Sequence, residues 1–289
     1  WSKKCFIYSK WEAHCFSILY GSYTSSFYGR NAFLNLTFTI GSPPVKIYVK
    51  VVDERNQYVS DSLVNIFSSN SLIASNVTNS SGIASFFLPA NSSYNFKIYW
   101  ENVSVGSFTK FVNKTTLFIF NVSIIYPTVF FITSSGIPVP YPLVSIVTPN
   151  GSLMPLKVAN KNGSLYLSRV PAGIYTFTVI YDDSEIISAQ KVLITKDTVV
   201  INVTNVYPVY IKTLTNSGSN LKDVFVEISN SSTGAQVGAG ITDKNGSIVF
   251  LLPRGNYTIN SYFVSNYYLT PIKQNISMEI TVNNTKNIT

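Results

Sequence analysis

The feature that most constrains the fold is a short motif that occurs three times, at intervals of roughly 80 residues. Each copy has a glycine, an alternating apolar stretch, a proline and then a tyrosine. The copies read GIASFFLPANSSY from Gly82, GSLYLSRVPAGIY from Gly163 and GSIVFLLPRGNY from Gly246. A repeat of this length is too long for one turn of a solenoid and suits a whole small domain. The motif therefore predicts tandem domains.

The joints between the repeats carry a second signal. Strand-like runs continue through a proline into the next strand-like run, at Pro44, Pro127 and Pro208. Proline cannot donate to a sheet ladder, so it suits a junction between strands. Joints this short predict a fairly stiff rod. The predicted units are an N-terminal β segment at 1–43 and β-sandwiches at 44–126, 127–207 and 208–289.

Within the repeats, apolar residues alternate with period two, as in YTFTVIY and DVFVEI. This alternation is typical of half-buried strands. Many short strands separated by turn signals favour β-sandwiches, and no repeat predicts a helix. We therefore expect an all-β chain of tandem Ig-like β-sandwiches in a rod, preceded by an incomplete N-terminal β segment.

The repeats resemble the carboxypeptidase regulatory-like domain, which is also called the prealbumin-like sandwich. The first repeat lacks the glycine before Tyr94, and the second keeps Gly163, Pro171, Gly173 and Tyr175. The resemblance implies the sandwich fold and says little about function, because such modules serve as spacers, adhesin stalks and enzyme appendages. The third repeat carries the fullest match, through Thr242, Asp243, Gly246, Phe250, Leu252, Pro253, Gly255 and Tyr257.

The DKNG stretch of the third repeat also begins like a calcium loop. It offers Asp243 and Asn245 but no distal bidentate glutamate. The first repeat has Asn79 at the aspartate position and the second has Asn160. A site that loses its charge in its sister copies is better interpreted as a turn. We expect no metal and no cofactor, apart from N-linked glycans.

The candidates for catalysis are few, and we predict that the chain is not an enzyme. His14 is the only histidine, and its neighbour Cys15 is expected to form a disulfide with Cys5 in an oxidising compartment. The alternative is two reduced core thiols. A cysteine nucleophile would need a free thiol. The carboxylates that could pair for glycoside hydrolysis lie in loop-like positions, at Asp53 and Glu54 and at Asp182, Asp183 and Glu185.

Asn-x-Ser/Thr triplets are unusually dense. Chance would place about six in a chain with this content of Ser and Thr, and the observed number is more than double. Turn preferences do not explain triplets within strand-like runs such as FNVSI. The sequence thus predicts a secreted or cell-surface glycoprotein. The candidate glycosylation sites are Asn35, Asn76, Asn79, Asn91, Asn102, Asn113, Asn121, Asn150, Asn162, Asn202, Asn230, Asn245, Asn256, Asn275, Asn283 and Asn287.

The charge pattern excludes some partners. Charged residues make up 12% of the chain, about half of the usual roughly 25%. Lys and Arg are scattered, which argues against a nucleic-acid partner, and no apolar run approaches the length of a membrane span. A chain with only 13 acidic residues has few paired carboxylates to lose on acidification. This favours the hypothesis that the protein works in an acidic medium.

The first 41 residues parallel the second half of the first repeat, which suggests half a sandwich. Half a sandwich exposes an apolar face and unpaired edges that invite β-strand addition from another chain. The missing half would be absent from this chain or supplied by a neighbouring molecule; a disulfide-closed capping hairpin is the alternative. The predicted subunit contacts are Tyr20, Tyr23, Phe27 and Tyr28.

Together these features predict a structural glycoprotein of an extracellular assembly. Its overall character is similar to the surface glycoproteins of thermoacidophilic archaea, which implies a filament subunit joined by strand complementation or an S-layer stalk. An adhesin or glycan-binding module and the accessory domains of a secreted enzyme are the other hypotheses. The expected partners are further copies of the chain and other cell-envelope proteins.

Overall fold

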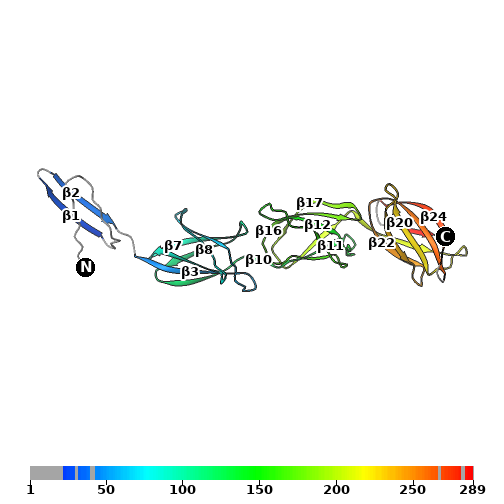
Figure 1. Ribbon diagram of the computed structural model, residues 1–289, viewed down its shortest axis with the longest axis horizontal. Helices are drawn as coiled ribbons and strands as arrows, with labels where there is room; N and C mark the ends of the chain where they lie inside the picture. The colour runs from blue at the N-terminus through cyan, green and yellow to red at the C-terminus, as the bar shows by residue number, and fades with distance from the viewer. Residues whose placement is uncertain (1–21, 30–31, 40–42, 266–267, 281–283, 289) are drawn as a thin grey trace. The chain divides into compact units, whose positions relative to one another are not determined.

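The computed structural model describes residues 22–29, 32–39, 43–265, 268–280 and 284–288 (Figure 1). Within these ranges every regular element is a β-strand, so the all-β prediction is confirmed. The chain divides into two compact units, Trp1–Val122 and Ser123–Thr289. The first unit holds an N-terminal hairpin and one Ig-like sandwich, and the second holds two further sandwiches.

The first sandwich consists of a three-stranded and a four-stranded sheet. The smaller sheet has the order β6-β3-β9 and the larger has the order β5-β4-β7-β8. In β6 every second side chain is buried, as period-two alternation predicts for a strand with one face against a core. The strands are β3 (Pro44–Val52), β4 (Leu63–Ser68), β5 (Ser71–Val77), β6 (Ile83–Pro89), β7 (Ser92–Trp100), β8 (Val103–Val112) and β9 (Thr116–Asn121).

Aromatic contacts join the two sheets of the first sandwich. Phe96 on β7 packs against Phe120 on β9, with ring centroids 5.3 Å apart, and Phe120 stacks on Phe108 of β8 at 4.4 Å. Phe96 and Phe120 are almost fully buried. Such ring pairs add about 0.5–1.5 kcal/mol each beyond the apolar area that they bury. They anchor the closing strand β9 to the opposite sheet.

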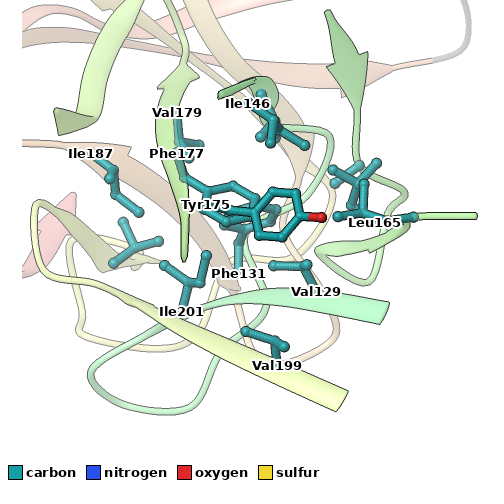
Figure 2. Packing of buried hydrophobic residues seen from close by; sticks show 14 of the residues in the cluster. Val129, Phe131, Ile146, Leu165, Tyr175, Phe177, Val179, Ile187, Val199 and Ile201 are labelled. Atoms are coloured by element: carbon teal, nitrogen blue, oxygen red, sulfur yellow. The ribbon is translucent and has the colours of Figure 1, made fainter. Parts of the chain in front are cut away.

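The second sandwich repeats this plan, with the sheets β14-β11-β18 and β13-β12-β16-β17 and a short extra pair, β10-β15. Its core contains Phe131 and Phe177, whose rings meet edge to face at 6.3 Å (Figure 2). Figure 2 also shows Tyr175 within this aliphatic cluster. The strands are β10 (Ile124–Ile125), β11 (Thr128–Thr133), β12 (Leu143–Val147), β13 (Lys157–Val158), β14 (Ser164–Tyr166), β15 (Val170–Pro171), β16 (Gly173–Tyr181), β17 (Ser184–Ile194) and β18 (Thr198–Val203).

The third sandwich has the sheets β22-β19-β25 and β21-β20-β23-β24. Pro44 is the first residue of β3 and Pro127 directly precedes β11, as predicted for a junction, whereas Pro208 lies within β19, opposite Leu251 of β22. The strands are β19 (Val206–Thr213), β20 (Val224–Asn230), β21 (Gln236–Ile241), β22 (Ser247–Pro253), β23 (Gly255–Ser265), β24 (Tyr268–Ile280) and β25 (Asn284–Ile288).

In each sandwich the last strand pairs in parallel with the first. β9 pairs with β3, β18 with β11 and β25 with β19. All other pairings within the three sandwiches are antiparallel. Each of the three sandwiches is therefore closed by a strand from its own repeat.

The repeated tyrosine is held by a hydrogen bond to the repeated proline. The phenol donates to the Pro carbonyl in all three copies, from Tyr94 to Pro89 at 2.8 Å, from Tyr175 to Pro171 at 2.7 Å and from Tyr257 to Pro253 at 2.9 Å. All three tyrosines are buried. The first copy makes the bond although its loop is one residue longer, and Asn91 in that loop adopts a left-handed φ of 61°. The bond fixes the turn between two strands that belong to opposite sheets.

Replacing one of these tyrosines by phenylalanine should destabilise its sandwich. Tyr175→Phe leaves the Pro171 carbonyl without this donor inside the core, at a cost of about 1–2 kcal/mol in the free energy of unfolding. Urea unfolding followed by circular dichroism measures the change. Tyr166→Phe, at a strand position that is 55% exposed, is the control and should change stability by less than about 0.5 kcal/mol. Equal effects of the two substitutions would contradict this role for the phenol.

Candidate functional site

The calcium-like stretch is a turn in all three repeats. Asp243 Oδ1 accepts hydrogen bonds from the backbone N–H groups of Asn245 and Ser247, both at 2.9 Å. In the first repeat Asn79 Oδ1 accepts from Ser81 and Ile83, each at 3.0 Å. An amide oxygen thus replaces the carboxylate without loss of a bond, which is why the charge is dispensable in the sister copies. The structure thus shows a turn at this position, and the expected absence of a metal stays a prediction.

A glycine completes each of these turns. Gly82, Gly163 and Gly246 have φ values of 69°, 66° and 69°, where side chains with a Cβ are strained. A Cβ on Gly163 would also lie 2.5 Å from the Phe131 carbonyl oxygen. This close approach of two backbones explains why the motif begins with glycine. Among the residues that the structure describes, no group of three or more His, Cys, Asp and Glu gathers as metal ligands would.

The turn interpretation predicts how the third sandwich responds to substitution and to calcium. Asp243→Ala should lower the free energy of unfolding by about 1 kcal/mol, because two backbone donors lose their acceptor. Asp243→Asn should stay within about 0.5 kcal/mol of the unchanged chain, since the sister copies use asparagine. Calcium should leave the melting temperature of all three proteins unchanged. A melting temperature that rises with calcium and loses this rise in Asp243→Asn would show a metal site instead.

The first of the predicted carboxylate groups is structural. Asp53 is fully buried, and its Oδ1 accepts hydrogen bonds from the backbone N–H groups of Arg55 and Gln57, both at 2.9 Å. It therefore shapes the turn after β3. Asp53 thus lies in a turn, as predicted, but its side chain is buried because it replaces water as the acceptor for backbone donors.

The second carboxylate group lies in the turn between β16 and β17. Asp182 and Asp183 have left-handed φ values of 47° and 56°, which two-residue hairpin turns require. Asp182 is half-buried, and its Oδ2 is a buried atom without a hydrogen-bond partner. Burial, with a smaller effect of Asp183, raises the pKa of Asp182 to about 6.

A tyrosine beside this carboxyl contacts the third sandwich. The Tyr181 hydroxyl donates a hydrogen bond to the Leu251 carbonyl oxygen at 3.2 Å, and Leu251 packs against the core of the second sandwich. Burial and then Asp182 raise the pKa of Tyr257 to about 12. Burial also raises the pKa of Tyr181, with smaller effects of Asp182 and Tyr257. A poorly solvated carboxyl thus lies beside two phenols within the second unit.

The raised pKa of Asp182 makes stability depend on pH. The folded chain binds this proton more tightly than the unfolded chain, so this carboxyl makes the fold more stable as the pH falls from about 6 to about 4. Asp182→Asn should stabilise the chain at pH 7 by about 1 kcal/mol or less, because the carboxyl is still partly in contact with solvent, and should do nothing at pH 4. Urea unfolding at both pH values measures this. Asp61→Asn, an exposed turn residue, is the control; a gain for Asp182→Asn that is equal at both pH values would contradict the assignment.

The candidate glycosylation sites lie on the surface wherever the structure describes their side chains. Of twelve such asparagines, eleven are exposed and Asn230 is half-buried. Asn121 and Asn202 occupy outward-facing positions of the closing strands β9 and β18. Side-chain exposure is not described for Asn35, Asn275, Asn283 and Asn287. Glycosylation itself stays a prediction, and the eleven exposed positions are accessible for it.

Part of the predicted N-terminal segment forms a hairpin. β1 (Ser22–Gly29) pairs antiparallel with β2 (Ala32–Thr39), and no third strand joins them within the described residues. Cys5, Cys15 and Tyr20 lie outside the described residues, as does His14. The register places Tyr23, Phe27, Leu34, Leu36 and Phe38 at positions on one face, whereas Tyr28 and Phe33 share the other face with Asn35 and three threonines. One face thus has five large apolar positions, and the other is mostly polar.

The hairpin differs from the predicted half sandwich. The sequence similarity aligns β2 with β9. However, β9 pairs with β3 in a parallel ladder, whereas β2 pairs with β1 in an antiparallel one. The described part of the segment is therefore a hairpin, and capping of the first domain and strand addition from another chain both stay predictions. The proposed disulfide and the subunit contacts stay predictions.

Comparisons with known proteins leave the function open. None of the protein-family models and none of the curated proteins matches the chain. Among solved structures, the chain is similar to the Bacillus anthracis TIE protein, with 15% identity, a TM-score of 0.28 and coverage of 93% of this chain and 57% of that one. It thus spans little more than half the length of that protein. A Streptococcal ancillary pilin has 12% identity and a TM-score of 0.29, with 84% of this chain and 98% of that chain covered.

A third solved structure is GBS52, the minor pilin of Streptococcus agalactiae. It has 13% identity and a TM-score of 0.37, with 56% of this chain and 95% of that chain covered. Scores of this size do not assign a function. Among the described residues, no helix is long and apolar enough to cross a membrane.

Proposed function

We propose that the chain is a structural subunit of an extracellular assembly, a filament subunit that joins its neighbours by β-strand complementation. The observation that carries the proposal is the β1–β2 hairpin. Its register gathers five large apolar residues at positions on one face, and no further strand or sheet pairs with it among the described residues. An isolated two-stranded hairpin is marginally stable in water, so this segment needs a partner.

The three sandwiches restrict where complementation can act. Each already has its own closing strand paired with its first strand, so none of them needs a donor strand to be complete. We therefore propose strand addition at the N-terminal segment. The features that all three repeats share, which are the turn glycines and the Tyr–Pro hydrogen bonds, stabilise the fold. This suits a chain with a mechanical role, which is to bear load and to separate its two ends.

Surface glycans support the same proposal. The exposed asparagine triplets are spread over all three sandwiches, which suits a protein that faces solvent along its length outside the cell. The small number of carboxylates and the raised pKa of Asp182 both favour folding at low pH. These features fit a surface structure in an acidic medium.

Substitutions on the two faces of the hairpin test the proposal. Leu34→Asp and Leu36→Asp place charge on the apolar face and should abolish assembly, because a buried unpaired carboxylate is strongly unfavourable. Thr24→Asp and Thr37→Asp on the opposite face are the matched controls and should assemble normally. Sedimentation velocity measures the association of the full-length chain, and negative-stain microscopy shows its form.

Each result of this experiment has a defined meaning. Fibres that form with the controls and not with the apolar-face variants support the filament. A two-dimensional lattice would favour an S-layer role over a filament. A full-length chain that stays monomeric at high concentration, or apolar-face variants that assemble like the controls, would overturn the proposal.

A further inference from the structure

The outer face of the four-stranded sheet in the first sandwich has a hollow of about 470 Å³. It is open to solvent and lies at the end of the sheet where β4 turns into β5. Its size falls within the range of small-molecule sites. The lining residues are Phe67, Ser69, Asn70, Ser93, Tyr94, Asn95, Lys97 and Thr109.

The lining combines two aromatic residues, Phe67 and the buried Tyr94, with hydrogen-bonding groups and a single charge. Lys97 Nζ lies 4.8 Å from the centre of the Phe67 ring. The Asn95 amide is oriented by Thr109 and Ser107, with which it makes long hydrogen bonds of 3.4 Å. None of the lining residues is acidic, so the ammonium of Lys97 makes the hollow positive.

The turn at the rim of the hollow has an unusual backbone. Ser69 and Asn70 have φ values of 46° and 68°, a left-handed pair that turns β4 back into β5. This tight turn brings the Ser69 and Asn70 side chains to the hollow without a long loop. Their polar groups add to those of Ser93 and Asn95 on the neighbouring strand.

The sister sandwiches lack this combination. Strand register places Val147 and Ser229 where the first sandwich has Phe67. The same register places Thr178 and Asn260 where it has Lys97. The turn glycines and the Tyr–Pro hydrogen bonds occur in all three copies because the fold needs them. The Phe67 ring and the Lys97 ammonium occur together in the first copy only, so the fold of the repeat does not require them.

We propose that this hollow binds an acidic saccharide. A sugar ring offers an apolar C–H face that packs on an aromatic ring, and its hydroxyls match the amides and hydroxyls of the lining. The positive charge of Lys97 selects a sugar that carries a carboxylate or a sulfate, because a charge-assisted hydrogen bond is about twice as strong as a neutral one. Phe67 supplies the contact surface, and Lys97 sets the specificity for charge.

Two sources could supply this ligand. Asn91 begins an Asn-Ser-Ser triplet two residues before Ser93, so a glycan on this chain could fold back into the hollow. A glycan on another molecule is the second source. The chemistry is the same in both cases, and the glycosylation state of the protein distinguishes them.

The test is a titration of the full-length chain, made without glycans, with a disaccharide that contains a uronic acid and with its neutral counterpart. Isothermal calorimetry and NMR shifts of the Asn95 and Asn70 amides report binding. We expect Lys97→Gln to weaken binding of the acidic sugar about tenfold and to leave the neutral sugar unchanged. Phe67→Ala should weaken both sugars.

Lys46→Gln is the matched control. Lys46 Nζ also lies over aromatic rings, 5.0 Å from Tyr48 and 5.8 Å from Phe87, but on the outer face of the other sheet, away from the hollow. This variant should bind both sugars normally. Thermal unfolding of each variant separates loss of binding from loss of folding.

The glycosylated chain gives the second arm. If its own glycan fills the hollow, it should bind added sugar only after Asn91→Gln; if the source is another molecule, it should bind added sugar with or without Asn91→Gln. The proposal is overturned if the unglycosylated chain binds no acidic sugar at about 10 mM, or if Lys46→Gln loses as much affinity as Lys97→Gln.

Discussion

The parallel pairing of the first and last strand in each sandwich is the constraint on which the rest of the structure depends. Parallel neighbours cannot be joined by a tight turn, so the five or more strands between them must cross to the second sheet and return. Because the two strands run in the same direction, the chain enters each sandwich at one end and leaves it at the other. Modules with this property can follow one another through joints of a few residues, as they do after β9 and β18.

Two repeated hydrogen-bond devices support this pairing. The side-chain oxygen of Asn79, Asn160 or Asp243 closes the turn before the strand that pairs with the first strand. The tyrosine then anchors the next turn to the proline carbonyl, where the chain passes to the other sheet. The acceptors in both devices are neutral amide or carbonyl oxygens, except for the carboxylate of Asp243, which asparagine replaces in the other two repeats. A fold stabilised in this way depends little on ion pairs, which agrees with its low content of charged residues.

The structural features that could be predicted from the sequence are those that depend on neighbouring residues and recur in every repeat. Period-two alternation and the Gly–Pro–Tyr spacing sufficed for the strands, the turn at Asp243 and the sandwich class. Contacts between distant segments could not be predicted in this way. The burial of Asp53, the unpartnered oxygen of Asp182 and the hollow beside Phe67 and Lys97 each depend on residues from other strands. The half-sandwich prediction did not include the pairing of β1 with β2, because the segment resembles strands that lie in opposite sheets of a complete sandwich.

The central claim is that the three sandwiches are complete in themselves while the N-terminal hairpin is completed by another chain. Hydrogen exchange measured by mass spectrometry on the monomer and on the assembled form tests it most directly. The amides of the closing strands β9, β18 and β25 should be protected in both forms. The amides of β1 and β2 should exchange quickly in the monomer and slowly in the assembly. A hairpin that is as well protected in the monomer as β9 would contradict the claim.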